Sequence, residues 1–163
     1  MRKLTTILCL TLAVLLGSAG TSWSADFQKG LTAYNSGDYA DALREWKPLA
    51  EQGNASAQFN LGRIYAKGTG VSQNHETAVK LFRFAAEQGL ADAQNNLARM
   101  YYAGTGVPKD YVFAYMWANV AVTLGYKNAI KGRDILAKKM TPADISTAQK
   151  LARECVRKKY KGC

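Results

Sequence analysis

Apolar residues in the middle of the chain recur at helical spacing, in two successive stripes. The first stripe is formed by Ala57, Leu61, Ile64 and Tyr65, whose spacing of three and four residues places them on one face of a helix. After a glycine-rich break, a second stripe with the same spacing follows, made of Ala78, Val79, Phe82, Ala85 and Ala86. No segment alternates apolar and polar residues as a half-buried strand does. The pattern therefore predicts pairs of helices joined by loops.

The helix pair repeats along the chain at an interval of 36 residues. The sequence Ala-Glu-Gln-Gly at 50–53 returns at 86–89, and Gly-Thr-Gly-Val at 68–71 returns at 104–107. The same interval relates Leu61 to Leu97 and Tyr65 to Tyr101. Glycine in each break readily adopts the left-handed conformation that ends a helix. A period of this length is typical of solenoids built from stacked helix pairs.

These repeated residues resemble the Sel1-like repeat, a relative of the tetratricopeptide repeat. The resemblance rests on small, aromatic and glycine positions in two units, namely Leu61-Gly62, Tyr65, Gly68 to Val71, Ala78, Ala86, Gly89 and Ala93, and then Leu97 through Gly125. The first unit is closer to a plain tetratricopeptide repeat, with Gly30, Gly37 to Tyr39, Ala42-Leu43 and Trp46. The resemblance implies an all-α fold: a right-handed α-solenoid of stacked helix-turn-helix units at about 27–53, 55–89, 91–125 and a partial unit at 127–140, within a repeat domain spanning 25–140.

Residues 141–163 do not continue the repeat, and they are expected to form a capping helix and a basic tail. Thr141, Pro142 and Asp144 give this segment a start that resembles a capping box. Apolar residues at helical spacing would then cover the last exposed face of the array, namely Ile145, Ala148 and Leu151.

The first 24 residues have the three parts of a secretory signal peptide. Arg2 and Lys3 precede an apolar run over residues 7–17, and small residues including Ser22 and Ser24 follow. The run is shorter than the roughly 20 apolar residues that a spanning helix needs. We expect residues 1–24 to be a cleavable signal peptide, and the mature protein to be periplasmic or secreted, with no transmembrane segment.

Charge is unevenly distributed along the chain, whose formal net charge is +10. Residues 26–126 contain nine basic and nine acidic residues, whereas residues 127–163 contain eleven basic and three acidic ones. Cations at the end of a predicted helix interact favourably with its dipole. The excess of basic residues could therefore serve only to stabilise this helix end and to keep the protein soluble. The alternative is a docking patch for an anionic envelope surface or an acidic partner. No nucleic-acid motif or interleaved aromatic residues accompany the charge, so nucleic acid is not an expected partner.

Residues that could carry chemistry are few, and we expect no catalytic site, no metal site and no cofactor. The two Gly-Thr-Gly loops follow no predicted strand and lack the lysine and hydroxyl of a phosphate-binding loop, so they are interpreted as turns. His75 is the single histidine of the chain, and it is expected on the surface. The mature chain contains neither of the common serine nucleophile motifs.

Two cysteines, Cys155 and Cys163, remain after removal of Cys9 with the signal peptide. An even number of cysteines in an oxidising compartment favours a disulfide between them. The alternative is two free thiols in a reducing compartment.

The resemblance implies a non-catalytic scaffold or adaptor of the cell envelope, which binds a protein or peptide on the concave face of its repeat array. The first helices of the units would line this face with Phe27, Leu31 and Tyr34, then with the candidate partner-binding residues Phe59, Arg63, Lys67, Asn95, Arg99 and Tyr102. Aromatic residues beside arginines are typical of interface hot spots. Local pairing of both arginines with acidic residues on adjacent helices is the alternative.

A second functional hypothesis is an envelope enzyme or a peptidoglycan- or β-lactam-binding protein. Some secreted, cysteine-rich relatives are described in that role. Those relatives carry a cysteine pair in each repeat, and this chain does not.

Overall fold

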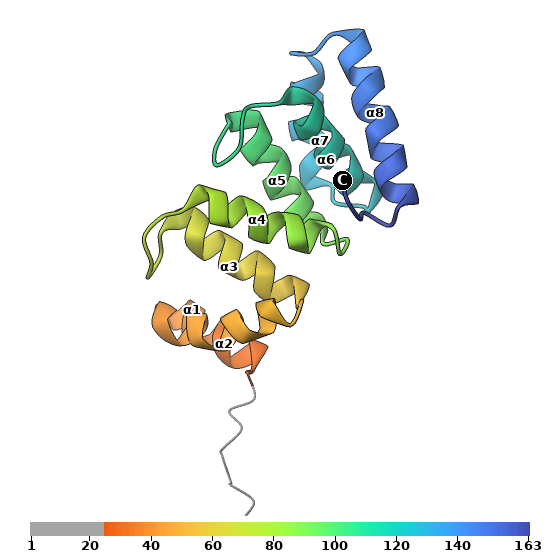
Figure 1. Cartoon of the computed structure of the whole chain (residues 1–163). Helices are drawn as coiled ribbons and strands as arrows, with labels where there is room; N and C mark the ends of the chain where they lie inside the picture. Colours follow the sequence, from red (N-terminus) through yellow and green to blue (C-terminus); the bar gives the residue numbers. More distant parts are fainter. Residues whose placement is uncertain (1–24) are drawn as a thin grey trace, which may run out of the picture.

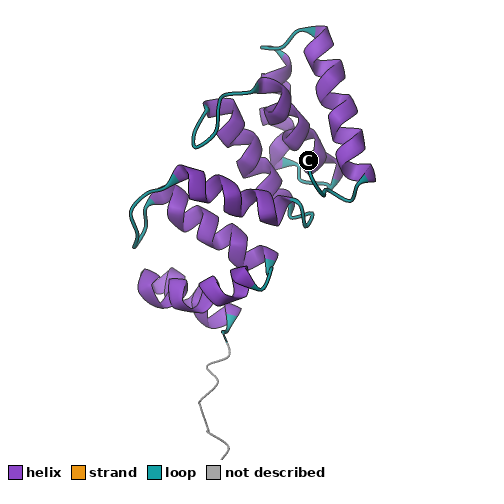
Figure 2. Ribbon diagram, viewed as in Figure 1, coloured by secondary structure: helices purple, strands orange, loops and turns teal. Residues whose placement is uncertain are grey.

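The described part of the chain, residues 25–163, folds into eight α-helices in a computed structural model (Figure 1). No strand occurs among these residues (Figure 2). The expected signal peptide, residues 1–24, lies outside the described residues. In chain order the helices are α1 (Phe27–Ser36), α2 (Tyr39–Glu51), α3 (Ala55–Lys67), α4 (His75–Ala86), α5 (Ala91–Ala103), α6 (Tyr111–Thr123), α7 (Asn128–Ala137) and α8 (Pro142–Arg157).

The helices pack as successive antiparallel pairs, each against the next in sequence. The pairs are α1–α2, α3–α4 and α5–α6, and α2 also contacts α3 as α4 contacts α5. At the end of the array, α6 is covered by both α7 and α8 (Figure 1). The predicted all-α array of stacked helix pairs is thereby confirmed.

Polar caps and left-handed glycines fix the ends of these helices. The Asn54 side chain accepts a hydrogen bond from the Ala57 amide at the start of α3, and Asn74 does the same for Thr77 at the start of α4. Gly68 and Gly104, one period apart, end α3 and α5 with φ of 70° and 69°. These caps satisfy backbone groups that helix ends leave without partners.

Each Gly-Thr-Gly loop packs against the start of the second helix of the preceding unit. A Cβ atom on Gly70 would lie 2.5 Å from the Tyr39 Cβ, and one on Gly106 would lie 2.4 Å from the His75 carbonyl oxygen. The loops are therefore turns that let adjacent units approach closely. This contact also corrects the expectation for His75, which is half-buried, with its Nδ1 atom buried and without a hydrogen-bond partner among the described residues.

Small residues recur in the units because the helices cross closely. A Cβ atom on Gly62 of α3 would lie 2.7 Å from the Phe82 ring of α4. Ala78, Ala85 and Ala93 have no exposed surface. In the first unit, Gly30 leaves the space that the Trp46 ring occupies, and the Trp46 Nε1 donates a hydrogen bond to the Phe27 carbonyl. Interiors packed this closely leave no room for larger side chains.

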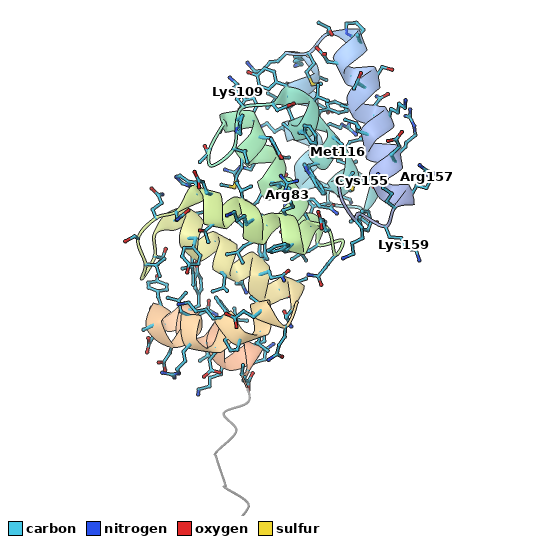
Figure 3. The ribbon with its side chains drawn as sticks, in the orientation of Figure 1. Arg83, Lys109, Met116, Cys155, Arg157 and Lys159 are labelled. Atoms are coloured by element: carbon cyan, nitrogen blue, oxygen red, sulfur yellow. A yellow bond between two sulfur atoms is a disulfide. The ribbon has the colours of Figure 1, made fainter. Side chains whose placement is uncertain are left out.

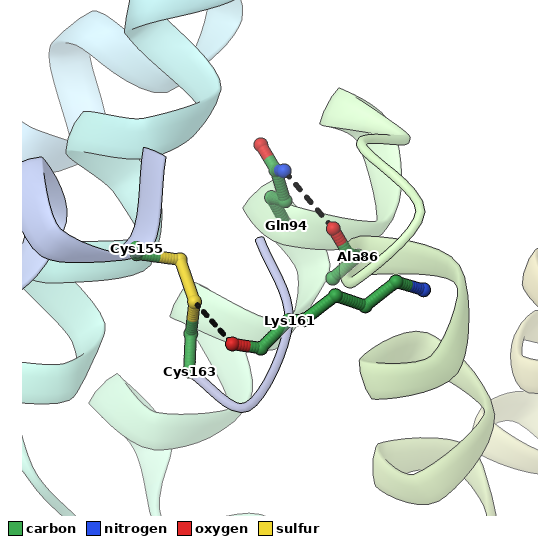
Figure 4. Close-up of a disulfide and its surroundings, with 5 residues drawn as sticks. All are labelled: Ala86, Gln94, Cys155, Lys161 and Cys163. Atoms are coloured by element: carbon green, nitrogen blue, oxygen red, sulfur yellow. Dashed lines mark hydrogen bonds between the residues drawn. A yellow bond between two sulfur atoms is a disulfide. The ribbon is translucent and has the colours of Figure 1, made fainter. Parts of the chain in front are cut away.

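The chain closes with the capped helix α8 and a short tail that folds back. Thr141 and Asp144 form a capping box, and Ala148, Ala152 and Cys155 are buried in the core that includes α6. Beyond α8 the backbone turns through left-handed conformations and a disulfide joins Cys163 to Cys155 (Figure 4). The predicted disulfide is present in the structure.

The tail also reaches an earlier unit of the array. A Cβ atom on Gly89, in the turn between α4 and α5, would lie 3.1 Å from the Tyr160 ring. Tyr160 is half-buried and packs against the core. The disulfide therefore ties the tail to α8, and Tyr160 brings the same tail against the turn between α4 and α5.

Removing the disulfide is expected to lower the free energy of unfolding. Replacing Cys155 and Cys163 together by Ser removes the constraint that the disulfide places on a short loop of the unfolded chain. The entropy that the unfolded chain gains corresponds to about 2–3 kcal/mol. Guanidinium denaturation of the oxidised protein and the double variant measures this loss. Equal midpoints for the two proteins would contradict it.

No helix within residues 25–163 has the length and apolar character needed to cross a membrane.

Candidate binding grooves

Two adjoining grooves lie between successive first helices of the units. The first, of about 620 Å³, lies between α3 and α5 over a floor that includes Phe82 of α4. The second, of about 570 Å³, lies between α5 and α7 and reaches Ala118 of α6. Arg99 and Tyr102 of α5 line both grooves, so the two form one continuous surface.

All six candidate partner-binding residues line these grooves. The first groove contains Phe59, Arg63 and Lys67 from α3. The second contains Asn95, and both contain Arg99 and Tyr102. The 36-residue period explains why these residues come together. Residues at equivalent positions of successive units lie on the first helices of neighbouring units.

The two arginines differ in their surroundings, although they occupy equivalent positions in successive repeats. The Arg63 guanidinium lies over the Tyr34 ring of α1, 5.4 Å from its centroid, and 5.9 Å from the centroid of Phe59. Arg99 is exposed, and its side chain makes no hydrogen bond to any residue in the described part of the chain. No carboxylate of the described residues lies within 4.0 Å of either guanidinium. The alternative of local acid pairing is therefore wrong in this structure.

The three residues expected to line the face in the first unit are placed differently. Phe27, Leu31 and Tyr34 pack against the core of the first units. The Phe27 and Tyr34 rings lie 5.8 and 5.6 Å from the Trp46 ring, between centroids. The physical reason is Gly30, which lets the indole lie against α1 where both rings can cover it. None of the three lines either groove, although Tyr34 contacts Arg63, which does.

A half-buried polar pair lies beside the second groove, which is lined by one of its members, Tyr126. The Tyr126 hydroxyl donates a hydrogen bond of 2.8 Å to Asp92 Oδ1. Burial, followed by this hydrogen bond, raises the pKa of Tyr126, while Asn128 and the positive charge of Arg99 act in the opposite direction. The phenol therefore remains a neutral donor, and Asp92 accepts its hydrogen bond.

Several residues of the second groove were not predicted. Lys131 and Ile135 of α7 line it together with Tyr126, Asn128 and Gly132. The repeat period could have found two of them, because Lys131 follows Asn95, and Ile135 follows Arg99, by 36 residues. The weaker sequence match beyond residue 127 obscured this continuation.

The grooves combine apolar walls with cationic side chains. Phe59, Tyr102 and Ile135 supply apolar or aromatic surface, and Arg63, Arg99 and Lys131 supply positive charge. Arginine can bind a carboxylate through two parallel hydrogen bonds. Within residues 25–163 no cluster of three or more His, Cys, Asp or Glu residues is arranged to hold a metal ion.

Comparison with known proteins identifies the repeats. Residues 55–90 and 91–126 each match the Sel1 repeat. The chain is 34% identical over 56 residues to the exopolysaccharide production negative regulator of Rhizobium meliloti (strain 1021), a match that covers 34% of this chain and 21% of that protein.

Two solved structures share the fold. A protective antigen present in uropathogenic Escherichia coli strains, which displays an SLR fold, has a TM-score of 0.77 and 32% identity, over 80% of this chain and 29% of its own. A Sel1 repeat protein from Oxalobacter formigenes has a TM-score of 0.67 and 30% identity, over 79% of this chain and 55% of its own. The chain thus spans about a fifth to about half the length of these relatives. Two consecutive repeat matches and two structural neighbours show that residues 55–126 are Sel1 repeats in a chain with the SLR fold.

Proposed function

We propose that this protein is a non-catalytic scaffold of the cell envelope that binds a segment of a partner protein in the two grooves. The observation that carries the proposal is the continuous surface between α3, α5 and α7, where Arg63 and Arg99 have no carboxylate partner among the described residues. A guanidinium beside apolar walls is suited to bind an anionic group that arrives with apolar neighbours.

The groove chemistry favours an extended acidic segment as the ligand. Arg63 and Arg99 lie one repeat apart, so two carboxylates separated along a peptide could reach them together. Apolar side chains between those carboxylates would contact Phe59 and Tyr102. Asn95 and Asn128 offer amide groups that can hydrogen-bond a peptide backbone in the second groove.

The envelope location is part of the proposal and rests on the expected signal peptide, residues 1–24. The disulfide between Cys155 and Cys163 supports an oxidising compartment, where such bonds persist. Intact-mass measurement of protein from the expressing cell tests this location. A mature species that still begins at Met1 would contradict export.

Groove binding can be tested with a peptide selected on the protein itself. Random peptides displayed on phage are panned against the chain, and an enriched peptide is measured by fluorescence anisotropy. We expect enrichment of acidic residues interspersed with apolar ones. Replacing Arg63 and Arg99 together by Ala should weaken binding by about 1–3 kcal/mol, roughly fivefold to 150-fold in Kd, because hot-spot arginines typically contribute this much.

A matched variant controls for the loss of two positive charges. Arg153 and Arg157 are exposed on α8, away from both grooves, and their replacement by Ala should leave peptide affinity unchanged. Equal losses in the two variants would mean that net charge alone attracts the peptide. Unchanged affinity in the Arg63 and Arg99 variant, or hydrolysis of a cell-wall substrate by the protein, would contradict the proposal.

A further inference from the structure

We propose that the outer face of α8 and the start of the tail form a second binding surface, which docks the protein onto an anionic phospholipid bilayer. This basic ridge consists of Lys150, Arg153, Arg157, Lys158 and Lys159. It is separate from the two grooves, because none of its residues lines them. The proposal therefore stands independently of the proposed function.

The ridge lies on the side of α8 that faces away from the core. Lys150, Arg153 and Arg157 are spaced by three and four residues, so they share one helix face. The opposite face carries Ala148, Ala152 and Cys155, which are buried. All five cations of the ridge are exposed, and Figure 3 shows Arg157 and Lys159 at the outer end of α8. No carboxylate in the described part of the chain lies within 4.0 Å of any of them.

The end of the ridge is held in a fixed conformation. Lys159 and Tyr160 have φ of 52° and 68°, which are uncommon for residues other than glycine. The Cys155–Cys163 disulfide closes this turn, and Tyr160 packs inward beside Gly89 (Figure 4 shows the disulfide). Because the tyrosine is the inward anchor of the loop, its basic neighbours are directed to solvent. A preorganised cation cluster loses less conformational entropy when it binds.

A bilayer fits this surface better than a folded partner or a nucleic acid. The ridge follows a straight helix, and the nearest cavity, bounded by Glu154, Lys158 and Gly162, is only about 90 Å³. A row of exposed lysine and arginine side chains suits an extended anionic surface, and clusters of four to eight such residues are typical of segments that bind acidic lipids. Base stacking is not available, because Tyr160 is packed against the core.

Vesicle sedimentation tests the proposal with protein made from the full-length sequence and taken from the soluble fraction. Vesicles of phosphatidylglycerol and phosphatidylcholine are compared with vesicles of phosphatidylcholine alone, at low and at high salt. We expect binding to the anionic vesicles only, and weaker binding as salt screens the charges. Replacing Lys150, Arg153 and Arg157 by Ala should lower the partition coefficient at least about tenfold, because each cation near a lipid surface contributes substantially.

The control variant removes three exposed lysines elsewhere, Lys47, Lys80 and Lys127. It should retain binding within about twofold, since these residues lie outside the ridge. Circular dichroism melting shows that both variants remain folded. Equal binding to neutral vesicles, an equal loss in both variants, or binding to soluble dextran sulfate without binding to anionic vesicles would overturn the proposal.

Discussion

Replacing Trp117 by Ala is expected to lower the free energy of unfolding by about 3–5 kcal/mol, the usual cost of removing a large buried aromatic side chain. Trp117 has no exposed surface. Its helix, α6, contacts α5, α7 and α8, so the cavity would lie in the helix that three others cover. Urea denaturation followed by circular dichroism measures the loss.

Two further variants separate packing from polar effects at this site. The Trp117 Nε1 is buried without a hydrogen-bond partner among the described residues, so Trp117→Phe keeps most of the ring volume and loses no hydrogen bond. It should cost clearly less than Trp117→Ala. Phe84 is 55% exposed on α4, and Phe84→Ala should change stability little. Similar losses for Trp117→Ala and Phe84→Ala would contradict the assignment of α6 to the centre of the core.

Replacing Gly106 by Ala is expected to destabilise the protein by about 2–5 kcal/mol, through a left-handed backbone and a steric clash. Gly106 has a φ of 72°, and an added Cβ would lie 2.4 Å from the His75 carbonyl oxygen. That oxygen belongs to the backbone at the start of α4, which cannot move without shifting the helix. Thermal and denaturant unfolding both report the loss.

Gly125 supplies a matched control for this substitution. Its φ is 82°, but an added Cβ would meet nothing within 4 Å. Gly125→Ala should therefore cost only the left-handed conformation, about 1–2 kcal/mol. The difference between the two variants measures the contact between the loop and the preceding unit. If Gly106→Ala cost no more than Gly125→Ala, that contact would not contribute to stability.

The stacked helix pairs could be predicted from the sequence because each unit repeats its neighbour. The 36-residue period fixes which residues face inward, and the buried Ala57, Ala78 and Ala93 are the small positions that it identifies. The period also places Arg63 and Arg99 on the first helices of adjacent units, and both residues line the first groove. Local capping residues such as Thr141 further determine where a helix begins.

What the period could not predict depends on contacts between residues that do not repeat. Phe27 and Tyr34 pack on Trp46 because Gly30 opens the space beside α1, and this arrangement occurs in the first unit of the described chain. Tyr160 reaches Gly89 across 71 positions of sequence, and no local pattern encodes that distance. The partial burial of His75 likewise depends on the loop of the following unit.

Gln94 shows how one changed residue alters a repeated contact. Gln58 and Gln94 each donate a hydrogen bond to a carbonyl eight residues earlier, on Ala50 and Ala86. Gln88 also donates to the Gln58 Oε1, at 2.7 Å. One period after Gln88 stands Leu124, and the buried Gln94 Oε1 has no partner among the described residues. The period predicts where the glutamine lies. Whether its Oε1 accepts a hydrogen bond depends on the residue beside it, which is Gln88 in one unit and Leu124 in the next.

Site-specific photo-crosslinking can show whether a peptide binds in the two grooves. A photoreactive phenylalanine analogue replaces Tyr102, which lines both grooves, or Phe84, which is exposed on α4 and lines neither of them. Each protein is irradiated with the peptide selected on the unmodified chain, and mass spectrometry locates the crosslink. We expect a crosslink from position 102 that is lost when Arg63 and Arg99 are replaced, and none from position 84. A crosslink from position 84 without one from position 102 would contradict it.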